Sequence, residues 1–430
     1  MGKVYLEKNV YEASQERMDV IFSKFDKICL AFSGGKDSSV MLNLGIEYAK
    51  KYNRKIGVMI VDLEGQYKIT MEHVQSMLDE NKEVIDAYWI CLPINLRNAV
   101  SVYQPFWCAW EPGLEEKWVR PIPDHHSVIS DQNFFPFYKY RMEFEEFVPE
   151  FNKWYGKGEK TAMLVGIRSD ESLNRFRTIK STSKKTYNGY KWTTRLTGSN
   201  VYNCYPIYDW RTEDIWAANG RFNWNYNRLY DMMYKAGVGI HSQRICQPYG
   251  DDQKIGLDLF RVIEPETWAR IVNRVSGANF GNIYCGNKVM GYRKVELPKG
   301  HTWRSYTRLL LDSLPPETKA SYIDKFAKFI RYWNRKGSAV PDELFDILPK
   351  EAVITDTFTN RGKKNKRLVK YKGIPDYLDS AIESKKAAPT WRRMASCILK
   401  NDHLCKGLSY AQTKNQTERM KNLVKKYKNL

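Results

Sequence analysis

The stretch that decides the fold is Lys27-Ile28-Cys29-Leu30-Ala31-Phe32-Ser33-Gly34-Gly35-Lys36-Asp37-Ser38-Ser39. Its apolar half predicts a short buried strand, and the polar half predicts a turn into a helix over about residues 38–52. Two adjacent glycines let the backbone bend so that its N–H groups face inward. The dipole of the following helix adds positive charge at the same point. The stretch therefore predicts a phosphate-binding loop, because such N–H groups cradle an anion.

We assign phosphate or nucleotide contact to the whole loop, which consists of Ser33, Gly34, Gly35, Lys36, Asp37, Ser38 and Ser39. Lys36 would neutralise phosphate charge, and Asp37 would either hold a magnesium ion or cap the helix, so both are catalytic candidates. The spacing of a Walker loop is absent. The alternative is an ordinary strand-to-helix turn with a Ser or Asp cap.

Strand and helix patterns alternate on both sides of this loop. Further strands are predicted at residues 55–61, 87–92, 161–167 and 201–207, and helices at 12–25, 70–81, 141–155 and 211–219. Such alternation favours a doubly wound α/β fold, with a mainly parallel sheet covered by helices on both faces. Residues 93–138, rich in Pro and Trp, predict a long irregular stretch.

The second half of the chain has a different pattern. Beyond residue 255 it is mainly helical, with helices predicted at 265–275, 302–313 and 316–336. A polar, basic stretch at 356–372 predicts a linker or hairpin before a final helical module. We therefore expect three parts: a nucleotide-binding domain at 1–250, a helical extension at 251–355 and a basic C-terminal module at 356–430.

The positive charge is concentrated near the C-terminus. The chain has 69 Lys and Arg against 49 Asp and Glu, a net charge of +20, and residues 361–430 alone carry 19 against 5. Such a segment suits a polyanion, with DNA or RNA as the first candidate. Trp391, Arg392 and Arg393 are the candidate nucleic-acid contacts, because the aromatic ring can stack on bases and the guanidinium groups can bind phosphates. The alternative is a solvated helical face.

Several features favour a cytoplasmic protein that does not enter a membrane. No apolar run is long enough for a transmembrane helix, and residues 1–8 contain no apolar signal core. The eight cysteines form no Cys-x-x-Cys pair, so we expect reduced thiols. Cys397, His403 and Cys405 have three metal-ligand side chains in a short segment, but buried thiols on a helix are the favoured interpretation.

The segment Ser33 to Ser38 resembles the pyrophosphate loop of the adenine nucleotide alpha-hydrolase-like superfamily, which includes ATP pyrophosphatases and phosphoadenosine phosphosulfate (PAPS) reductases. Three further segments are similar to the PAPS reductase branch, and the resemblance covers about residues 10–250. They are Val61-Asp62-Leu63-Glu64-Gly65, Gly166-Ile167-Arg168-Ser169-Asp170-Glu171-Ser172 and Tyr205-Pro206-Ile207-Tyr208-Asp209-Trp210-Arg211-Thr212-Glu213-Asp214-Ile215-Trp216.

This resemblance implies an adenine nucleotide, ATP or PAPS, as ligand. Gly166 lies near the end of the strand predicted at 161–167 and Arg168 follows it, where parallel sheets place ligand contacts. An Arg fork suits phosphate or sulfate, so Arg168 is both a binding and a catalytic candidate, the alternative being a surface ion pair with Asp170 or Glu171. Asp62 ends another strand and would hold magnesium or the adenosine sugar, or serve as a turn acid.

The later half resembles a subgroup of PAPS-reductase-like proteins with a long C-terminal extension, on the segments Arg274–Gly281 and Pro389–Arg393. That subgroup includes the immunoglobulin-binding regulator type. Its members are often encoded beside a ParB/sulfiredoxin-like protein, which the resemblance implies as a partner.

Departures from the reductase pattern affect the expected reaction. The family's C-terminal Glu-Cys-Gly-Leu-His-like tail is not matched by Lys425-Lys426-Tyr427-Lys428-Asn429-Leu430, and the paired cysteines of iron–sulfur adenosine phosphosulfate (APS) reductases are missing. We therefore expect no iron–sulfur cluster. Magnesium-dependent ATP pyrophosphatase chemistry with adenylyl transfer is the favoured function, acting on or with a nucleic acid or a partner protein. The alternatives are PAPS or APS reduction, with Cys246, Cys285, Cys397 or Cys405 as stand-in, and a non-enzymatic, nucleotide-gated nucleic-acid-binding regulator.

Overall fold

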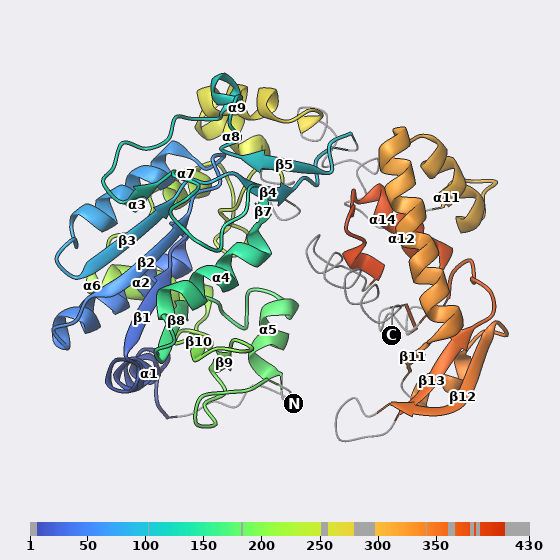
Figure 1. Cartoon of the computed structure of the whole chain (residues 1–430), viewed down its shortest axis with the longest axis horizontal. Coiled ribbons are helices and arrows are strands. Elements are labelled where there is room, and N and C mark those ends of the chain that lie inside the picture. Colours follow the sequence, from blue (N-terminus) through green and yellow to red (C-terminus); the bar gives the residue numbers. More distant parts are fainter. Residues whose placement is uncertain are drawn as a thin grey trace. The chain divides into compact units, whose positions relative to one another are not determined.

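The computed structural model describes residues 7–101, 103–181, 184–250, 257–278, 297–340, 342–359, 366–378, 382–383 and 388–408. The chain divides into two compact units (Figure 1). Unit 1 consists of Met1–Leu96, Cys108–Pro248 and Gly256–Arg274, and unit 2 of Arg97–Trp107, Tyr249–Ile255 and Val275–Leu430. The domain boundaries predicted after residues 250 and 355 remain predictions.

Unit 1 is built on a seven-stranded sheet in the order β6-β3-β2-β1-β8-β10-β9. Neighbouring strands are parallel except for the antiparallel pair β9–β10. The strands are β1 (Lys27–Ala31), β2 (Ile56–Val61), β3 (Ile85–Ile90), β6 (Val128–Ile129), β8 (Thr161–Val165), β9 (Thr193–Arg195) and β10 (Val201–Cys204). This mainly parallel sheet confirms the predicted α/β fold class.

The strand order reverses at β1, and its carboxyl end is where such sheets bind ligands. This strand lies between β2 and β8, so the order of the strands along the chain reverses there. Connections on the two sides of such a switch point diverge, and ligands of open α/β sheets bind in the gap. The predicted phosphate loop follows β1, and Gly166 and Arg168 follow β8. The topology therefore brings both predicted segments to one point.

Helices cover both faces of this sheet, with α4 on the viewer's side in Figure 1 and α2 behind. The predicted helices are confirmed, whereas α5, α7 and α8 were not predicted because seven or eight residues give little periodic signal. The helices are α1 (Val10–Lys24), α2 (Lys36–Lys51), α3 (Lys68–Asp79), α4 (Phe144–Gly156), α5 (Leu173–Lys180), α6 (Thr212–Phe222), α7 (Leu229–Lys235), α8 (Leu257–Ile263) and α9 (Pro265–Arg274).

Residues 93–138 are more regular than predicted. They contain β6 and two further short strands, β4 (Ile94–Arg97) and β5 (Phe106–Ala109). The latter two form a second small sheet with β7 (Met142–Glu143) in the order β5-β4-β7. Strands of two to four residues are too short to show the alternation that identifies a strand in sequence.

Unit 2 has its own core around α12 (Pro316–Arg335). Tyr322, Phe326, Phe329 and Trp333 lie on one face of this helix and are buried against Met394 and other residues of α14 (Trp391–Leu399). The stretch at 356–372 is a hairpin of β12 (Ala352–Thr359) and β13 (Lys366–Tyr371), as one of the two predictions for it stated. With β11 (Ser338–Ala339), it makes a three-stranded sheet that was not predicted. The other elements are α11 (Trp303–Asp312), η3 (Asp342–Ile347) and η4 (Lys406–Leu408). In the described ranges, no helix has the length and apolarity needed to cross a membrane.

Candidate phosphate and nucleotide site

The predicted phosphate loop is a tight turn whose shape depends on glycine. Gly34 has a φ of +70°, and a Cβ atom there would lie 2.8 Å from Cγ2 of Thr70. The hydroxyl of Ser38 lies 3.1 Å from the hydroxyl of Ser33 and donates to the carbonyl oxygen of Gly35 at 3.0 Å. Gly35 then caps α2 with no side-chain hydrogen bond of its own. The loop therefore begins the helix as the sequence predicts.

Lys36 is buried beside this loop. Its ammonium donates to the backbone carbonyl of Gln243 at 2.9 Å and lies 3.9 Å from Oδ2 of Asp37. Its backbone N–H donates to the hydroxyl of Tyr230 at 2.9 Å. Burial lowers the pKa of the Lys36 ammonium, and the carboxylate of Asp37 opposes that shift. A phosphate bound next to this ammonium would favour its charged form, because a nearby negative charge offsets the cost of burying the positive one.

Arg168 reaches the same loop from the end of β8. Its Nε donates to Oδ1 of Asp37 at 2.5 Å, and its side chain is 3% exposed. The Nη1 atom is buried and has no hydrogen-bond partner among the described residues. Arg168 is thus not a surface residue paired with Asp170 or Glu171. A buried guanidinium with an unused donor is the arrangement expected of an anion site.

Gly166 is the other residue that this strand end contributes. A Cβ atom there would lie 2.9 Å from the backbone oxygen of Asp37. Only glycine therefore allows the end of β8 to approach the first turn of α2 so closely. This contact sets the position of Arg168, two residues later, relative to Asp37.

Two predicted site residues are enclosed in internal hydrogen bonds. The hydroxyl of Ser39 is buried and lies 2.9 Å from Nε2 of His73. Burial of the His73 imidazole lowers its pKa to about 4. The carboxylate of Asp62 is fully buried, accepting from Nε1 of Trp89 at 2.8 Å and from the guanidinium of Arg120. Ser39 and Asp62 are therefore held by other groups of the protein, and Asp62 also accepts from the backbone N–H of Glu64 at 3.0 Å, as a turn acid does.

Three residues from a later part of the chain border the loop, and two of them, Asn227 and Tyr230, were not predicted. The third, Gln243, belongs to the polar segment His241–Pro248, whose resemblance to the reductase branch implies either a region that closes over substrate or an ordinary loop. Asn227 donates from Nδ2 to the carbonyl oxygen of Gly34 and to the hydroxyl of Thr70, both at 2.9 Å. Tyr230 and Gln243 are the two partners of Lys36 described above. The three residues lie 157 to 207 positions from their partners in the chain, on or beside the short helix α7. No local motif marks Asn227 or Tyr230, and only a long-range contact signal would have found them.

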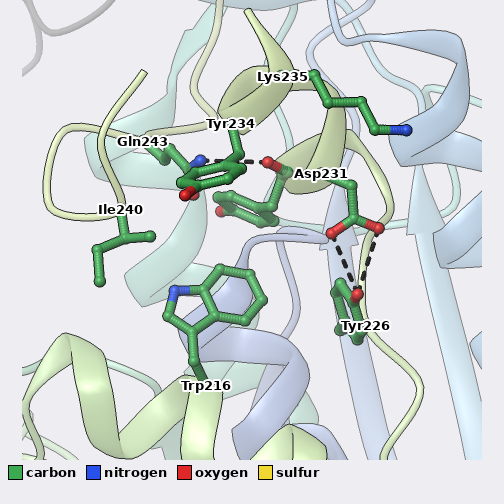
Figure 2. A pocket seen from close by; sticks show the side chains of 8 residues that line it. Trp216, Tyr226, Asp231, Tyr234, Lys235, Ile240 and Gln243 are labelled. Atoms are coloured by element: carbon green, nitrogen blue, oxygen red, sulfur yellow. Dashed lines mark hydrogen bonds between the residues drawn. The ribbon is translucent and has the colours of Figure 1, made fainter. Parts of the chain in front are cut away.

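A cavity of about 330 Å³ adjoins the loop (Figure 2). Tyr230 and Gln243 belong to its lining, together with Trp216, Tyr226, Tyr234 and Ile240. Tyr230 and Gln243 therefore line the cavity and also contact Lys36 of the loop.

The predicted nucleic-acid contacts are engaged within unit 2. The guanidinium of Arg393 is buried and donates to the carbonyl oxygens of Ala388 and Gly407. Arg392 pairs with Glu383 at 3.0 Å, and Trp391 packs against the core of the unit. These three side chains stabilise the start of α14, so their availability to a nucleic acid is limited.

The segment with Cys397, His403 and Cys405 is also internal. Both thiols are buried, and Nε2 of His403 lies 3.0 Å from the carbonyl oxygen of Ser101. Within the part of the chain that the structure describes, no three His, Cys, Asp or Glu side chains are grouped to hold a metal. Cys285 lies outside the described residues.

Two family models match the chain. A "Phosphoadenosine phosphosulfate reductase domain" matches residues 134–241, and a "Domain of unknown function (DUF3440)" matches residues 237–419. The first match covers β8, Arg168, α7 and most of the cavity lining. The second begins where the first ends, and it extends through α14.

Similar proteins were found by sequence and by structure. "Uncharacterized protein YbdN" of Escherichia coli is 38% identical over 418 residues, which covers 96% of this chain and 93% of YbdN. A PAPS reductase from Candida auris shares 13% identity, with a TM-score of 0.33, over 58% of this chain and 99% of its own. An NMN synthetase from Francisella tularensis shares 10% identity, with a TM-score of 0.27, over 69% of this chain and 100% of its own. The chain therefore belongs to the family of YbdN.

Proposed function

We propose that unit 1 is a magnesium-dependent ATP pyrophosphatase that transfers the adenylyl group to a nucleic acid or a partner protein. The observation that carries this proposal is the buried guanidinium of Arg168, held by Asp37 at the phosphate loop with Nη1 lacking a hydrogen-bond partner among the described residues. A buried donor without a hydrogen bond lowers the free energy of unfolding, so we expect a bound ligand to accept from it. A phosphate oxygen of the nucleotide would accept from this atom.

In the proposed reaction, a nucleophilic oxygen or nitrogen of the acceptor attacks the α-phosphorus of ATP. A bond from the acceptor to phosphorus forms, and the bond from phosphorus to the oxygen bridging to the β-phosphate breaks. Pyrophosphate leaves with that electron pair, and the proton of the acceptor passes to solvent. Lys36 and Arg168 would stabilise the negative charge that develops on the leaving group, because both are buried beside the loop.

Asp37 fits the magnesium ion that such chemistry uses. Magnesium is usually held by one or two carboxylates together with nucleotide phosphates, so the loop needs no larger protein cage. Oδ1 of Asp37 is taken by Arg168, whereas Oδ2 is 3.9 Å from Lys36. Magnesium bound there with ATP would offset phosphate charge.

Adenylyl transfer is tested with ATP labelled on the α- or the γ-phosphate. The proposal predicts that label from the α-phosphate appears on the acceptor, while label from the γ-phosphate appears in pyrophosphate. Gly35→Asp places a carboxylate in the loop and should abolish both signals. Release of γ-label as orthophosphate would instead indicate simple ATP hydrolysis and would contradict the proposal.

PAPS reduction is the second candidate, and Cys246 is the observation that favours it. Cys246 is partly exposed, whereas the other cysteines that the structure describes are buried. A thiolate at Cys246 would raise the pKa of Tyr230, whose hydroxyl accepts from the backbone N–H of Lys36. The thiolate of Cys246 would attack the sulfonate sulfur and displace the nucleotide, and a thioredoxin-like dithiol would then release sulfite and become a disulfide. Sulfite release from PAPS that Cys246→Ser abolishes would support this candidate.

We propose that the acceptor is a polyanion reached by the basic C-terminal segment. Residues 409–430 carry six Lys and Arg and one Glu, and they lie outside the described residues. The ParB/sulfiredoxin-like protein implied by the family resemblance is the corresponding protein candidate. A non-enzymatic regulator would show nucleic-acid binding that depends on nucleotide, with no labelled acceptor in the assay above.

A further inference from the structure

One stretch of unit 1 is strongly basic and is not used by the proposed reaction. Residues 172–208 contain seven Lys and Arg and no Asp or Glu. They include α5, the turn that follows it, and the strands β9 and β10 (Figure 1). Five of the seven cationic residues are exposed, and we refer to them together as the basic strip. They are Arg177, Lys180, Lys185, Lys191 and Arg195.

The charge of the basic strip is not neutralised by carboxylates. Among the described residues, none of its five cations forms an ion pair. Three other exposed lysines of unit 1 lie 2.7–3.9 Å from a carboxylate oxygen, and these are Lys51, Lys55 and Lys68. Unpaired charges of one sign in a single segment produce a positive potential that attracts anions. The basic strip therefore suits a ligand with several negative charges.

The segment that carries the basic strip folds back on itself. The backbone N–H of Arg195 donates to the carbonyl oxygen of Lys185 at 2.8 Å, and the ammonium of Lys184 donates to the carbonyl oxygen of Lys191 at 2.6 Å. These bonds hold three of the five cations in one compact turn. Ser181 ends α5 and precedes Lys184 by three positions, so the helix and the turn lie at most about 11 Å apart.

The basic strip extends from the phosphate loop to the opposite edge of the sheet. Its helix, α5, begins shortly after Arg168, which contacts the loop. Its turn contains Tyr187, whose ring centroid lies 4.7 Å from that of Phe25, just before the start of β1. The loop follows the other end of β1, and five strand residues span about 16 Å. The strip is thus long enough for a polymer rather than a single small anion.

Exposed aromatic rings lie among these cations. Phe176 is 40% exposed and Tyr190 is 38% exposed. The ammonium of Lys180 lies 5.2 Å from the ring centroid of Phe176, and the ring of Tyr190 lies 5.2 Å from that of Trp192. Cations that bind phosphates next to rings that stack on bases are typical of single-strand binding, because the bases of a duplex are already stacked on one another.

We propose that the basic strip binds single-stranded nucleic acid, either RNA or DNA, and presents it to the phosphate loop as the acceptor. Presentation to the loop rests on the proposed function, whereas binding to the strip does not. Positive charge on an edge strand such as β9 also prevents pairing with another chain. That role accounts for Arg195 on the strand, but not for Arg177 and Lys180 on a helix.

Fluorescence anisotropy of the full chain with labelled single-stranded RNA and DNA, without ATP, tests the contribution of charge. The triple variant Lys180→Gln, Lys185→Gln, Lys191→Gln should reduce the slope of log K against log salt by about 2, because each phosphate contact on a single strand contributes about 0.7. The triple variant Lys51→Gln, Lys55→Gln, Lys68→Gln removes the same charge and should keep the slope of the unmodified chain. Equal slopes in the two variants would overturn the proposal. The tighter of the two ligands identifies the sugar.

Tyr190→Ala tests the contribution of stacking. It should weaken single-strand binding about five- to a hundredfold and leave duplex binding unchanged. Tyr140→Ala, at a residue that is 53% exposed elsewhere in unit 1, is the control and should bind like the unmodified chain. An unchanged single-strand Kd in Tyr190→Ala would contradict the proposal.

Two further outcomes separate the alternatives. Binding of poly-glutamate, with no binding of either oligonucleotide, would assign an acidic protein to the basic strip and would also overturn the proposal. Single-strand binding that depends on the strip, without adenylyl transfer when ATP is added, would support the strip and count against the proposed function only.

Discussion

Arg168 donates from Nε to Oδ1 of Asp37 at 2.5 Å, although the two residues are 131 positions apart. One residue begins the helix after β1, and the other follows β8, which is the neighbour of β1 in the sheet. The ion pair therefore joins the two sides of the switch point. The ion pair also fixes the position of a second donor atom, Nη1 of Arg168, which has no hydrogen-bond partner among the described residues.

We expect Arg168→Lys to weaken ATP binding although the charge is retained. Lysine lacks the fork that lets arginine hold Asp37 and a phosphate oxygen together. The loss of one hydrogen bond to a charged group corresponds to about 1.5–3 kcal/mol, or about ten- to a hundredfold in Kd. Calorimetric titration with ATP and magnesium measures the change. Arg221→Lys, an exposed site on α6, should leave Kd unchanged.

Gly34→Ala should destabilise the protein more than Gly113→Ala. Both glycines have positive φ angles, +70° and +79°, so alanine is strained at both. A Cβ atom at Gly34 also lies 2.8 Å from Thr70, whereas at Gly113 nothing lies within 4 Å. The extra cost at Gly34 should be about 1–3 kcal/mol. Urea unfolding of the two variants measures it, and equal stabilities would show that the loop tolerates a side chain.

His73 should make the protein less stable in mild acid. Burial lowers its pKa to about 4 from 6.5, so between these values the unfolded chain binds a proton that the folded chain does not. Stability is therefore lost as the pH falls from about 6.5 towards 4, by about 3 kcal/mol once the pH is well below 4. Unfolding experiments at pH 7.5 and 4.5 on the unmodified chain and His73→Gln measure this contribution. A pH dependence that is the same in both would mean that His73 is not the group responsible.

Arg274→Met should strongly destabilise unit 1. The guanidinium of Arg274 holds both carboxylate oxygens of Glu64, at 2.7 and 3.1 Å, and both side chains are buried. Glu64 has a φ of +62°, so its backbone also depends on these contacts. Removing one partner of a buried ion pair costs about 3–5 kcal/mol, because the other charge is left unpaired.

Two further variants identify the cause of that loss. Arg270→Met lies on the same helix at an exposed position and should cost little. Adding Glu64→Gln to Arg274→Met should recover part of the stability, because the buried charge is removed. Thermal unfolding of the three variants measures this, and a double variant less stable than Arg274→Met would count against the explanation.

Deletion of residues 409–430 should weaken nucleic-acid binding and reduce its dependence on salt. Each phosphate contact contributes about 0.9 to the slope of log K against log salt on duplex DNA, and the segment has six basic side chains. Fluorescence anisotropy with a labelled duplex at several salt concentrations measures the slope. A slope unchanged by the deletion would place the contacts elsewhere in the chain.

The phosphate loop and Arg168 could be predicted because each is a continuous segment at the end of a predicted strand. Parallel strands bring such ends to one edge, so the sequence implied their proximity. Tyr230 could not be predicted, and neither could the contact of Gln243 with Lys36, because both depend on how distant segments fold over the loop. The hydrogen-bond partners of Asp62 could not be predicted for the same reason, since Trp89 and Arg120 come from other segments.

The prediction for the C-terminal module shows a different limit. Its charge could be counted from the sequence, but burial could not. Arg393 looked available because it is basic, whereas its guanidinium binds backbone carbonyls inside unit 2. The sequence of α14 shows which of its basic side chains are buried only once it is known that α12 packs against it.

Pyrophosphate release from ATP is the measurement that tests the central claim most directly. The unmodified chain, with magnesium and single-stranded or duplex nucleic acid, should release pyrophosphate in step with adenylyl transfer. Arg168→Lys and Gly35→Asp should lose this release, and Arg221→Lys should retain it. Sulfite release from PAPS with a thioredoxin-like reductant, without pyrophosphate release from ATP under any of these conditions, would contradict the account.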